Sequence, residues 1–519
     1  MASVALAAAP RPRKLRVGLF ADAPLQPRWV VEAFERVARS DFAEIVFVAA
    51  AGERREEPWL RRAYRRVDRL MFGGEPEERV DLATLREPGN DADPLKHDLD
   101  VAFVLGELDD TRYDGVARHG VWRFCFGNER GHADSLAGWR EVADGAPVTG
   151  SGVKVRLRRG TPPRLAYQSW SRTYPLSVER NRARLLRKTA EFPYRALREL
   201  YRSGEGWLEQ CKLVRAAGRR EFSDIDVLHA VSSVSARALK RGLEKALHVE
   251  QWFLAFRFGE GLALAPDLKG YVRMLPPKDR LWADPFAIEK NGRYFVYFEE
   301  LPFAARKGHI SMVEVKRDGS WSAPVRVLER DYHLSYPFLV ERDGELYMIP
   351  ESAQNGSVEV YRCVDFPARW KPEKKLIEGV RLVDPTFYEQ AGRWWMFANS
   401  GPGGSGQFDD ELCIFHAEKL LGTWEPHARN PVKSDARGAR PAGQLFWRAG
   451  VLYRPAQICI PLYGAGLSLN RVLRLTPHEY AERQVERILP RGGLLGLHTL
   501  NRAGDLAVTD AFARRRRFA

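Results

Sequence analysis

Three acidic residues of the chain, Asp284, Glu351 and Asp384, lie in strand-like segments at places where strand structure alone would not require a carboxylate. Two carboxylates with a third that tunes them suit cleavage or transfer of a glycosidic bond. In that chemistry one group protonates the leaving oxygen, and another activates water or attacks the anomeric carbon. Asp284 and Asp384 each precede a proline, and an Asp-Pro pair can also be a turn device. The sequence leaves both interpretations open.

Polar and aromatic residues close to these acids in the sequence pattern complete a candidate sugar-binding set. Aromatic rings can stack on a sugar face, while amide, imidazole and guanidinium groups can bind hydroxyl groups. The substrate-binding candidates are Trp282, Glu300, His333, Tyr336, Arg440, Gln457 and His498.

A repeat brings these distant residues into one predicted site. The segment Leu281 to Glu300 reads as two strands joined by an Asn-Gly turn, and similar segments follow at intervals of about 50 residues, the last of them the weakest. Repeats of this length with several short strands indicate a β-propeller. Four strands in each of five repeats predict five blades, whose equivalent positions face one central cavity. The turn glycines of the five copies are Gly292, Gly344, Gly392, Gly450 and Gly504.

Composition is that of a globular protein. The chain has 519 residues, with 45% hydrophobic and 29% charged residues and a formal net charge of +14. This charge would attract anionic lipid or phosphate, although an Arg-rich coding bias gives the same number. The five cysteines have no paired spacing that favours disulfides or zinc. We find neither a secretory signal nor an apolar membrane span, so we expect a cytoplasmic protein with peripheral contact at the inner membrane.

Residues 14–165 are predicted to form an α/β domain after a disordered tail, residues 1–13. A buried strand at Leu15 to Phe20, a helix at Trp29 to Ala38 and a second strand at Glu44 to Ala51 predict a parallel sheet. There is no glycine-rich phosphate-binding motif here.

A helical connector is expected over residues 166–250, before a propeller over residues 251–513 and a basic tail at 514–519. The last connector helix, Asp224 to Leu247, has an apolar stripe and a basic opposite side. Such a helix suits a membrane surface or a solvated face.

The stretch from His119 to Val155 resembles the N-terminal domain of the formyltransferases that act on methionyl-tRNA and sugar amines. Where that family has an Asn-x-His pair, this sequence has Arg123 and Cys125, and the family's Asp position falls near Arg159. The resemblance therefore implies a retained, degenerate scaffold, and folate is not expected to bind. A different polar site could form there from Arg123, Asn128, Glu129, Arg130 and His132.

The propeller region resembles the five-bladed glycosidases of the arabinanase and β-xylosidase type, through Trp-Ala-Asp-Pro-Phe at residues 282–286 and the later Asp-Pro. The resemblance implies Asp284 as general base, Glu351 as general acid and Asp384 as the residue that orients and tunes the acid. The order of the second Asp and the Glu differs from the usual order in that family.

Nearly the whole chain is similar to bacterial proteins of polysaccharide loci that join a formyltransferase-like domain to a propeller. The N-terminal region of plant glucosamine inositolphosphorylceramide transferase looks similar too. The segments that carry this resemblance are KGHISMVEV, HLSYPFLVE, YMIPES, RPAGQLF and YRPAQ. It implies a role in building glycolipid or surface polysaccharide.

Three hypotheses follow. In the first, the propeller binds a sugar, nucleotide sugar or glycolipid and performs glycosyl transfer or hydrolysis. In the second, the N-terminal domain transfers a formyl or acyl group to an amino sugar. In the third, the protein binds sugar without turnover as a scaffold for a glycosyltransferase. No cofactor and no nucleic acid partner is predicted, and a divalent cation in the propeller channel is compatible with the acids.

Overall fold

The computed structural model describes residues 13–52, 57–73, 77–86, 93–127, 137–214, 223–259, 265–401 and 408–517. The chain forms two compact units. Residues 1–169 and 174–235 make up one, called here the α/β unit, and residues 170–173 and 236–519 make up the other, the propeller unit. The predicted connector is divided between them, because most of its helices belong to the α/β unit.

A six-stranded sheet forms the centre of the α/β unit, in the order β3-β1-β5-β6-β7-β8. The first four strands run parallel, as the sequence pattern predicts, whereas β7 runs antiparallel to β6. The sheet is therefore mixed. Its topology does not test the resemblance to formyltransferases, which stays a prediction. The strands are β1 (Leu15–Ala21), β3 (Ala43–Ala50), β5 (Val101–Leu105), β6 (Val121–Phe126), β7 (Val148–Arg156) and β8 (Arg164–Arg172), with a small pair β2 (Leu25–Pro27) and β4 (Arg79–Asp81) beside them.

Helices pack against this sheet through apolar stripes. Helix α1 buries Val30, Phe34 and Val37, and α5 adds Leu197 and Leu200 to the same core. This burial explains why the helices α4 to α6 belong to the α/β unit and do not form a separate connector. The helices are α1 (Arg28–Ala38), α2 (Trp59–Phe72), α3 (Trp139–Asp144), α4 (Val178–Thr189), α5 (Phe192–Ser203), α6 (Glu205–Gln210) and α7 (Asp224–Leu247), with short 3-10 turns η1 (Leu82–Leu85), η2 (Pro94–His97) and η3 (Asp110–Tyr113).

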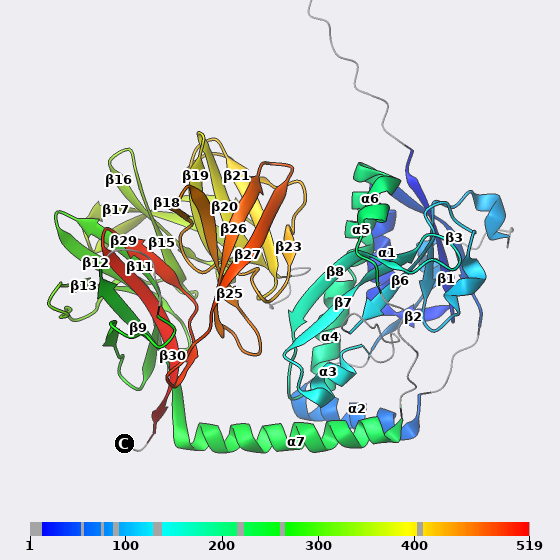
Figure 1. The fold of residues 1–519 in the computed structure, drawn as a ribbon, viewed down its shortest axis with the longest axis horizontal. Coiled ribbons are helices and arrows are strands. Elements are labelled where there is room, and N and C mark those ends of the chain that lie inside the picture. The colour runs from blue at the N-terminus through cyan, green and yellow to red at the C-terminus, as the bar shows by residue number, and fades with distance from the viewer. Residues whose placement is uncertain are drawn as a thin grey trace, which may run out of the picture. The chain divides into compact units, whose positions relative to one another are not determined.

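Five antiparallel sheets make up the propeller unit, which confirms the predicted five-bladed propeller (Figure 1). The sheets are β11-β12-β13-β14, β15-β16-β17-β18, β19-β20-β21-β22 with β23 on β21, β24-β25-β26-β27, and β10-β9-β30-β28 with β29 on β30. The strand bounds are β9 (His248–Phe258), β10 (Val272–Met274), β11 (Arg280–Lys290), β12 (Arg293–Pro302), β13 (His309–Val315), β14 (Val325–Leu328), β15 (Ser335–Arg342), β16 (Glu345–Glu351), β17 (Ser357–Asp365), β18 (Arg369–Glu378), β19 (Leu382–Gln390), β20 (Arg393–Ser400), β21 (Glu411–Ala417), β22 (Glu425–Pro426), β23 (Lys433–Ser434), β24 (Phe446–Arg448), β25 (Val451–Ile458), β26 (Gly466–Leu475), β27 (Tyr480–Ile488), β28 (Leu494–Gly496), β29 (Leu500–Ala503) and β30 (Leu506–Arg516), and the 3-10 turn η5 (Ala353–Asn355) lies between β16 and β17.

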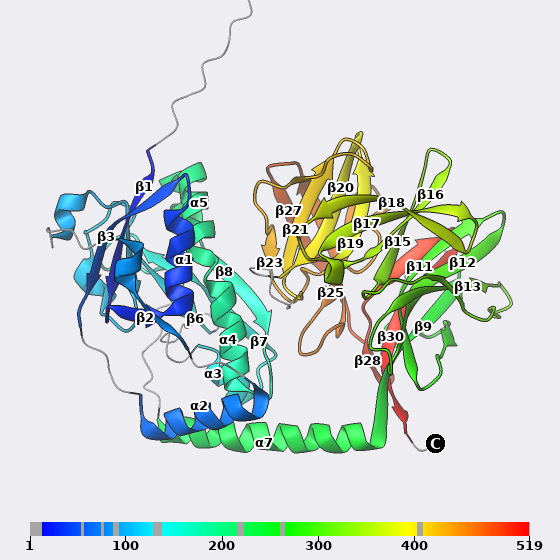
Figure 2. The same ribbon diagram turned by 180° about the vertical axis from the view of Figure 1, so that it is seen from behind.

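The fifth sheet joins the two ends of the propeller. Strand β9, the first of the unit, pairs along its whole length with β30, the last, and the two lie side by side in Figures 1 and 2. Closing the ring with strands from both ends removes two free sheet edges. The weak fifth repeat of the sequence is weak because half of its blade comes from β9 and β10.

Two-residue turns fix the hairpins of the repeat. Asn291, Asp343, Ala391 and Ala449 all have φ between 50° and 55°, and each precedes a glycine with positive φ. Two successive left-handed residues define the turn whose twist matches that of paired strands. This confirms the predicted hairpins and sets the register of the residues that reach the propeller centre.

Candidate active site

The first strands of three blades share a backbone irregularity at the residues that the repeat makes equivalent. Asp284, Tyr336 and Asp384 have φ of 53°, 45° and 51°, and each lies at a shift in the register of its hairpin. A left-handed conformation is unfavourable for a residue with a side chain, most of all for a tyrosine. Its recurrence in three blades marks these positions as functional candidates.

Asp284 is buried among polar partners. Its Oδ1 atom accepts a hydrogen bond from Thr499 Oγ1 at 2.9 Å and lies 3.8 Å from His498 Nε2. Burial, together with the negative charges of Asp384 and Asp510, raises the pKa of Asp284 to about 7, against the opposing effect of His498. Asp284 therefore carries a proton for part of the time at neutral pH.

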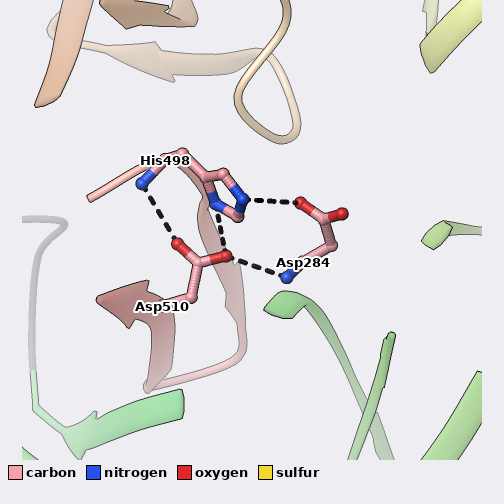
Figure 3. A group of neighbouring side chains, drawn as sticks. All are labelled: Asp284, His498 and Asp510. Atoms are coloured by element: carbon pink, nitrogen blue, oxygen red, sulfur yellow. Dashed lines mark hydrogen bonds and ion pairs between the residues drawn. The ribbon is translucent and has the colours of Figure 1, made fainter. Parts of the chain in front are cut away.

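Asp510 holds this part of the site together (Figure 3). Its carboxylate accepts hydrogen bonds from the backbone N–H groups of Asp284, His498 and Thr499 at 2.8, 3.1 and 2.9 Å. It also contacts His498 Nδ1 at 2.5 Å, and the pKa of His498 is raised by Asp510 and Asp284 despite burial. The Trp252 ring stacks on the imidazole with 4.0 Å between centroids. Asp510 was not among the sequence-predicted residues.

Glu351 of the second blade and Asp384 of the third blade lie close together. Asp384 is wholly buried and forms a two-point ion pair with Arg440, at 2.6 Å and 3.1 Å, and Gln457 Nε2 donates to it at 2.8 Å. Burial and the charge of Asp384 raise the pKa of Glu351 to about 8, while Arg440 opposes this. Glu351 therefore holds a proton at neutral pH more readily than an ordinary glutamate does.

Glu299 completes the group of acids. Burial, with the nearby charges of Asp284 and Glu351, raises its pKa well above the ordinary value. His333 Nε2 lies 3.5 Å from Glu299 Oε1, and His333 Nδ1 accepts a hydrogen bond from the Gly308 backbone N–H. Burial and the charge of Arg440 lower the pKa of His333. Both shifts favour the uncharged form of the side chain.

A simple register rule relates the second strands of the first four blades. Glu299, Glu351, Asn399 and Gln457 each follow the turn glycine of their hairpin by seven residues. In the first three blades these residues lie opposite the residue just before the left-handed position. Glu300 was the sequence-predicted substrate-binding candidate of the first blade, whereas the register places Glu299 at this position.

Asn399 has an unusual environment. It is fully buried, and neither its amide oxygen nor its amide nitrogen has a hydrogen-bond partner among the described residues. Such groups are rare because each costs about 1–3 kcal/mol, and they call for an explanation. A ligand that reached the second strand of the third blade would satisfy both atoms.

The remaining aromatic and basic candidates lie around these groups. The Tyr336 hydroxyl accepts a hydrogen bond from the Gly443 backbone N–H at 2.6 Å and is 2.8 Å from Thr386 Oγ1. The Arg440 guanidinium lies over the ring of Tyr463, 4.7 Å from its centroid. Tyr463, like Trp252, was not among the sequence-predicted residues.

Two of the predicted residues lie apart from this group. Trp282 and Glu300 are paired across their hairpin, on the face opposite to Glu299. Trp282 packs in an apolar cluster with Phe298, and Glu300 pairs with Arg280 at 2.8 Å and accepts a hydrogen bond from Ser311. Side chains alternate along a strand, so a step of one residue moves a side chain to the other face.

Of the N-terminal candidates, only Arg123 lies in the described part of the chain. Its guanidinium donates to the Gly106 carbonyl at 2.9 Å and pairs with Asp110 at 3.5 Å. These contacts give it a structural role beside the carboxyl end of β5. The other four, Asn128, Glu129, Arg130 and His132, lie outside the described residues.

Within the part of the chain that the structure describes, Asp284, His498 and Asp510 form a group that could hold a metal ion, with one ligand atom each within 4.8 Å of the others. Both oxygens of Asp510 already accept hydrogen bonds from backbone N–H groups, and the Nδ1 atom of His498 faces that same carboxylate. A metal ligand needs a free lone pair directed at the ion. The three residues therefore fit a hydrogen-bonded chain better than a metal site.

The buried acids predict how stability depends on pH. A carboxyl group whose pKa is raised on folding binds more protons folded than unfolded, so stability falls as the pH rises from about 4 to about 7 for Asp284. We expect Asp284→Asn to flatten this fall by up to about 1.4 kcal/mol per pH unit. Asp343→Asn is the matched control, because Asp343 has the same φ of 53° and is exposed. Denaturant unfolding at several pH values measures the slopes, and equal slopes in both variants would contradict the assignment.

The fold and the site define a five-bladed β-propeller with buried acids and an arginine where its blades meet. Residues 276–492 match the family model described as glucosamine inositolphosphorylceramide transferase 1, N-terminal. The chain is 33% identical over 206 residues to the glucosamine inositolphosphorylceramide transferase 1 of Arabidopsis thaliana, and 35% identical over 203 residues to that of Oryza sativa subsp. japonica. These matches cover 39% and 38% of this chain and 27% of each relative, so the matched region spans about a quarter of the relatives' length.

Solved structures give more distant similarities. A family 117 glycoside hydrolase of Zobellia galactanivorans has a TM-score of 0.32 and 14% identity, over 45% of this chain and 75% of that chain. An exo-1,5-α-L-arabinanase from a bovine ruminal metagenomic library has a TM-score of 0.32 and 13% identity, over 45% and 92% of the two chains.

Proposed function

We propose that this protein is a carbohydrate-active enzyme that transfers or hydrolyses a glycosyl linkage at the centre of its propeller, in the synthesis of glycolipid or surface polysaccharide. One observation carries the proposal: buried acids from different blades, Asp284 and Glu351, have pKa values raised to about 7 and about 8. Such a pair can supply a proton and accept one at neutral pH. The similarity to glucosamine inositolphosphorylceramide transferases supports a sugar and a glycolipid as the substrate class.

In this proposal Glu351 is the general acid, because it holds its proton at neutral pH. It protonates the oxygen that leaves the anomeric carbon. Asp384, fixed by Arg440 and Gln457, keeps a negative charge beside Glu351, which sustains the raised pKa of Glu351. Charge on the leaving oxygen is thereby neutralised as the bond breaks.

Asp284 is the proposed general base, acting on water or on an acceptor hydroxyl. Its ionised form is favoured by the hydrogen bond from Thr499 and by the nearby His498. Asp510 is a positioning residue, because it binds the backbone of Asp284 and the ring of His498. Unpartnered polar atoms of Asn399 supply one donor and one acceptor for a sugar hydroxyl.

A screen of nucleotide sugars, glycolipids and aryl glycosides tests the proposal. We expect the parent to turn over a substrate in this panel. We expect Asp284→Asn to bind that substrate but to lose about 10²- to 10⁴-fold in turnover. Binding that survives in both proteins with no turnover in the parent would favour a non-catalytic sugar-binding scaffold for a glycosyltransferase. We also propose that the protein is cytoplasmic.

A further inference from the structure

Helix α7 exposes an apolar stripe. Ile225, Leu228, Leu239, Leu243 and Leu247 are 72%, 61%, 68%, 58% and 59% exposed. At about 100° per residue, these five side chains fall within roughly a third of the helix circumference. The buried residues of α7, Val227 and Ala230, lie on the other side. An isolated exposed leucine needs no explanation, but a row along a 24-residue helix does.

Basic side chains lie on the polar side of the second half of α7, with Arg241 and Lys245 opposite the apolar stripe. Lys240, Arg241 and Lys245 are exposed on α7. The end of β30 reaches the end of the helix, where Arg517 donates a hydrogen bond to the Lys245 carbonyl and Arg514 pairs with Glu244 at 2.8 Å. The acid of this helix turn is thus already paired, and the polar side of this half of α7 carries net positive charge.

A second helix repeats the pattern in the α/β unit. Helix α2 exposes Trp59, Val67, Leu70 and Met71, and the exposed arginines Arg62 and Arg66 lie between them in the sequence. Helix α2 lies beside the first half of α7 (Figures 1 and 2), and Leu60 and Tyr64 of α2 join the cluster that contains Val227 and Ala230. Nearly half of the exposed large apolar side chains among the described residues lie on these two helices.

Their chemistry selects one kind of partner. Leucine and tryptophan beside lysine and arginine, on helices with one buried side, suit the boundary between lipid headgroups and acyl chains. The centre of a protein–protein interface would carry fewer charged residues than these two helices expose. No helix in the described ranges is both long and apolar enough to cross a bilayer. We infer that the exposed face of α7 docks on the surface of an anionic lipid bilayer.

Vesicle flotation with the full chain tests this inference. The vesicles are phosphatidylcholine alone and an equimolar mixture of phosphatidylcholine and phosphatidylglycerol. We expect binding to the mixed vesicles, a loss of about tenfold or more with Leu239→Gln/Leu243→Gln/Leu247→Gln, and a loss of about tenfold on mixed vesicles alone with Lys240→Gln/Lys245→Gln. All five positions are exposed and glutamine favours helix, so both variants should fold.

A control with the same chemistry is available on the propeller. Leu473, Val485 and Leu489 are 53%, 45% and 50% exposed, and their triple change to glutamine should leave vesicle binding unchanged. Absence of binding by the parent, or equal binding by the leucine variant, would overturn the inference. A parent that sediments as a dimer and a leucine variant that sediments as a monomer would also overturn it, because the face would then join two copies.

Discussion

Glu351→Gln should lose about 10²- to 10⁴-fold in turnover of substrates with a poor leaving group. The amide keeps the shape of the side chain but has no proton to give to the leaving oxygen. Aryl glycosides whose phenolate leaves without protonation should lose far less. Comparing the two substrate kinds in steady-state kinetics separates a general acid from a residue that only binds.

Glu341→Gln provides the control, because Glu341 is exposed on the first strand of the same hairpin. It should leave both rates unchanged. An equal loss on both substrate kinds in Glu351→Gln would contradict the role of general acid and would indicate a role in binding or folding. Retained turnover on poor leaving groups would exclude the role altogether.

Arg440→Met should destabilise the protein by about 3–5 kcal/mol, because it leaves Asp384 buried and charged without its partner. Asp384 is fully buried, and Arg440 contacts both of its oxygens. After the substitution, Gln457 remains as one donor to that carboxylate. Denaturant unfolding of the full chain, followed by tryptophan fluorescence, measures the change in midpoint.

Two further variants distinguish the ion pair from simple loss of packing. Arg448→Met removes a half-exposed arginine of the same blade and should change stability by less than about 0.5 kcal/mol. Arg440→Met/Asp384→Asn removes both charges and should recover much of the loss. A double variant no more stable than Arg440→Met would show that the buried charge is not the cause.

Much of the propeller could be predicted from the sequence because its repeat is regular. Apolar strands around Asn-Gly or similar turns recur at Gly292, Gly344, Gly392 and Gly450, and each forms the hairpin expected. The same regularity made Asp284 and Asp384 equivalent before their shared left-handed backbone was known. The spacing of a residue from a turn can be read from the sequence alone, without knowledge of how the blades pack.

Register within the second strands could not be fixed in the same way. Glu299 and Glu300 are adjacent acids, and only the pairing of Ala283 with Glu299 decides which of them faces the other acids. In the third blade, Asn399 and Ser400 are likewise adjacent polar residues, and the pairing with Val383 selects Asn399. The alternation of side chains along a strand does not show which of two adjacent residues faces the site. The pairing with a neighbouring strand is needed to decide this.

Asp510 and Trp252, which belong to the fifth blade, could not be predicted from the sequence. Asp510 follows Gly504 by six residues rather than seven, and its blade is completed by β9, which lies about 250 residues earlier in the chain. Trp252 of β9 stacks on His498 only because the ring closes. Contacts that depend on closure of the whole fold have no local sequence signal.

The most direct test of whether the propeller carries the chemistry is turnover by Asp284→Asn compared with Arg123→Gln, on the substrate that the parent processes. Arg123 represents the candidate site of the α/β unit, and Asp284 that of the propeller. We predict that turnover is lost in Asp284→Asn, with substrate binding retained, and kept in Arg123→Gln. Turnover that survives in Asp284→Asn would contradict the proposal.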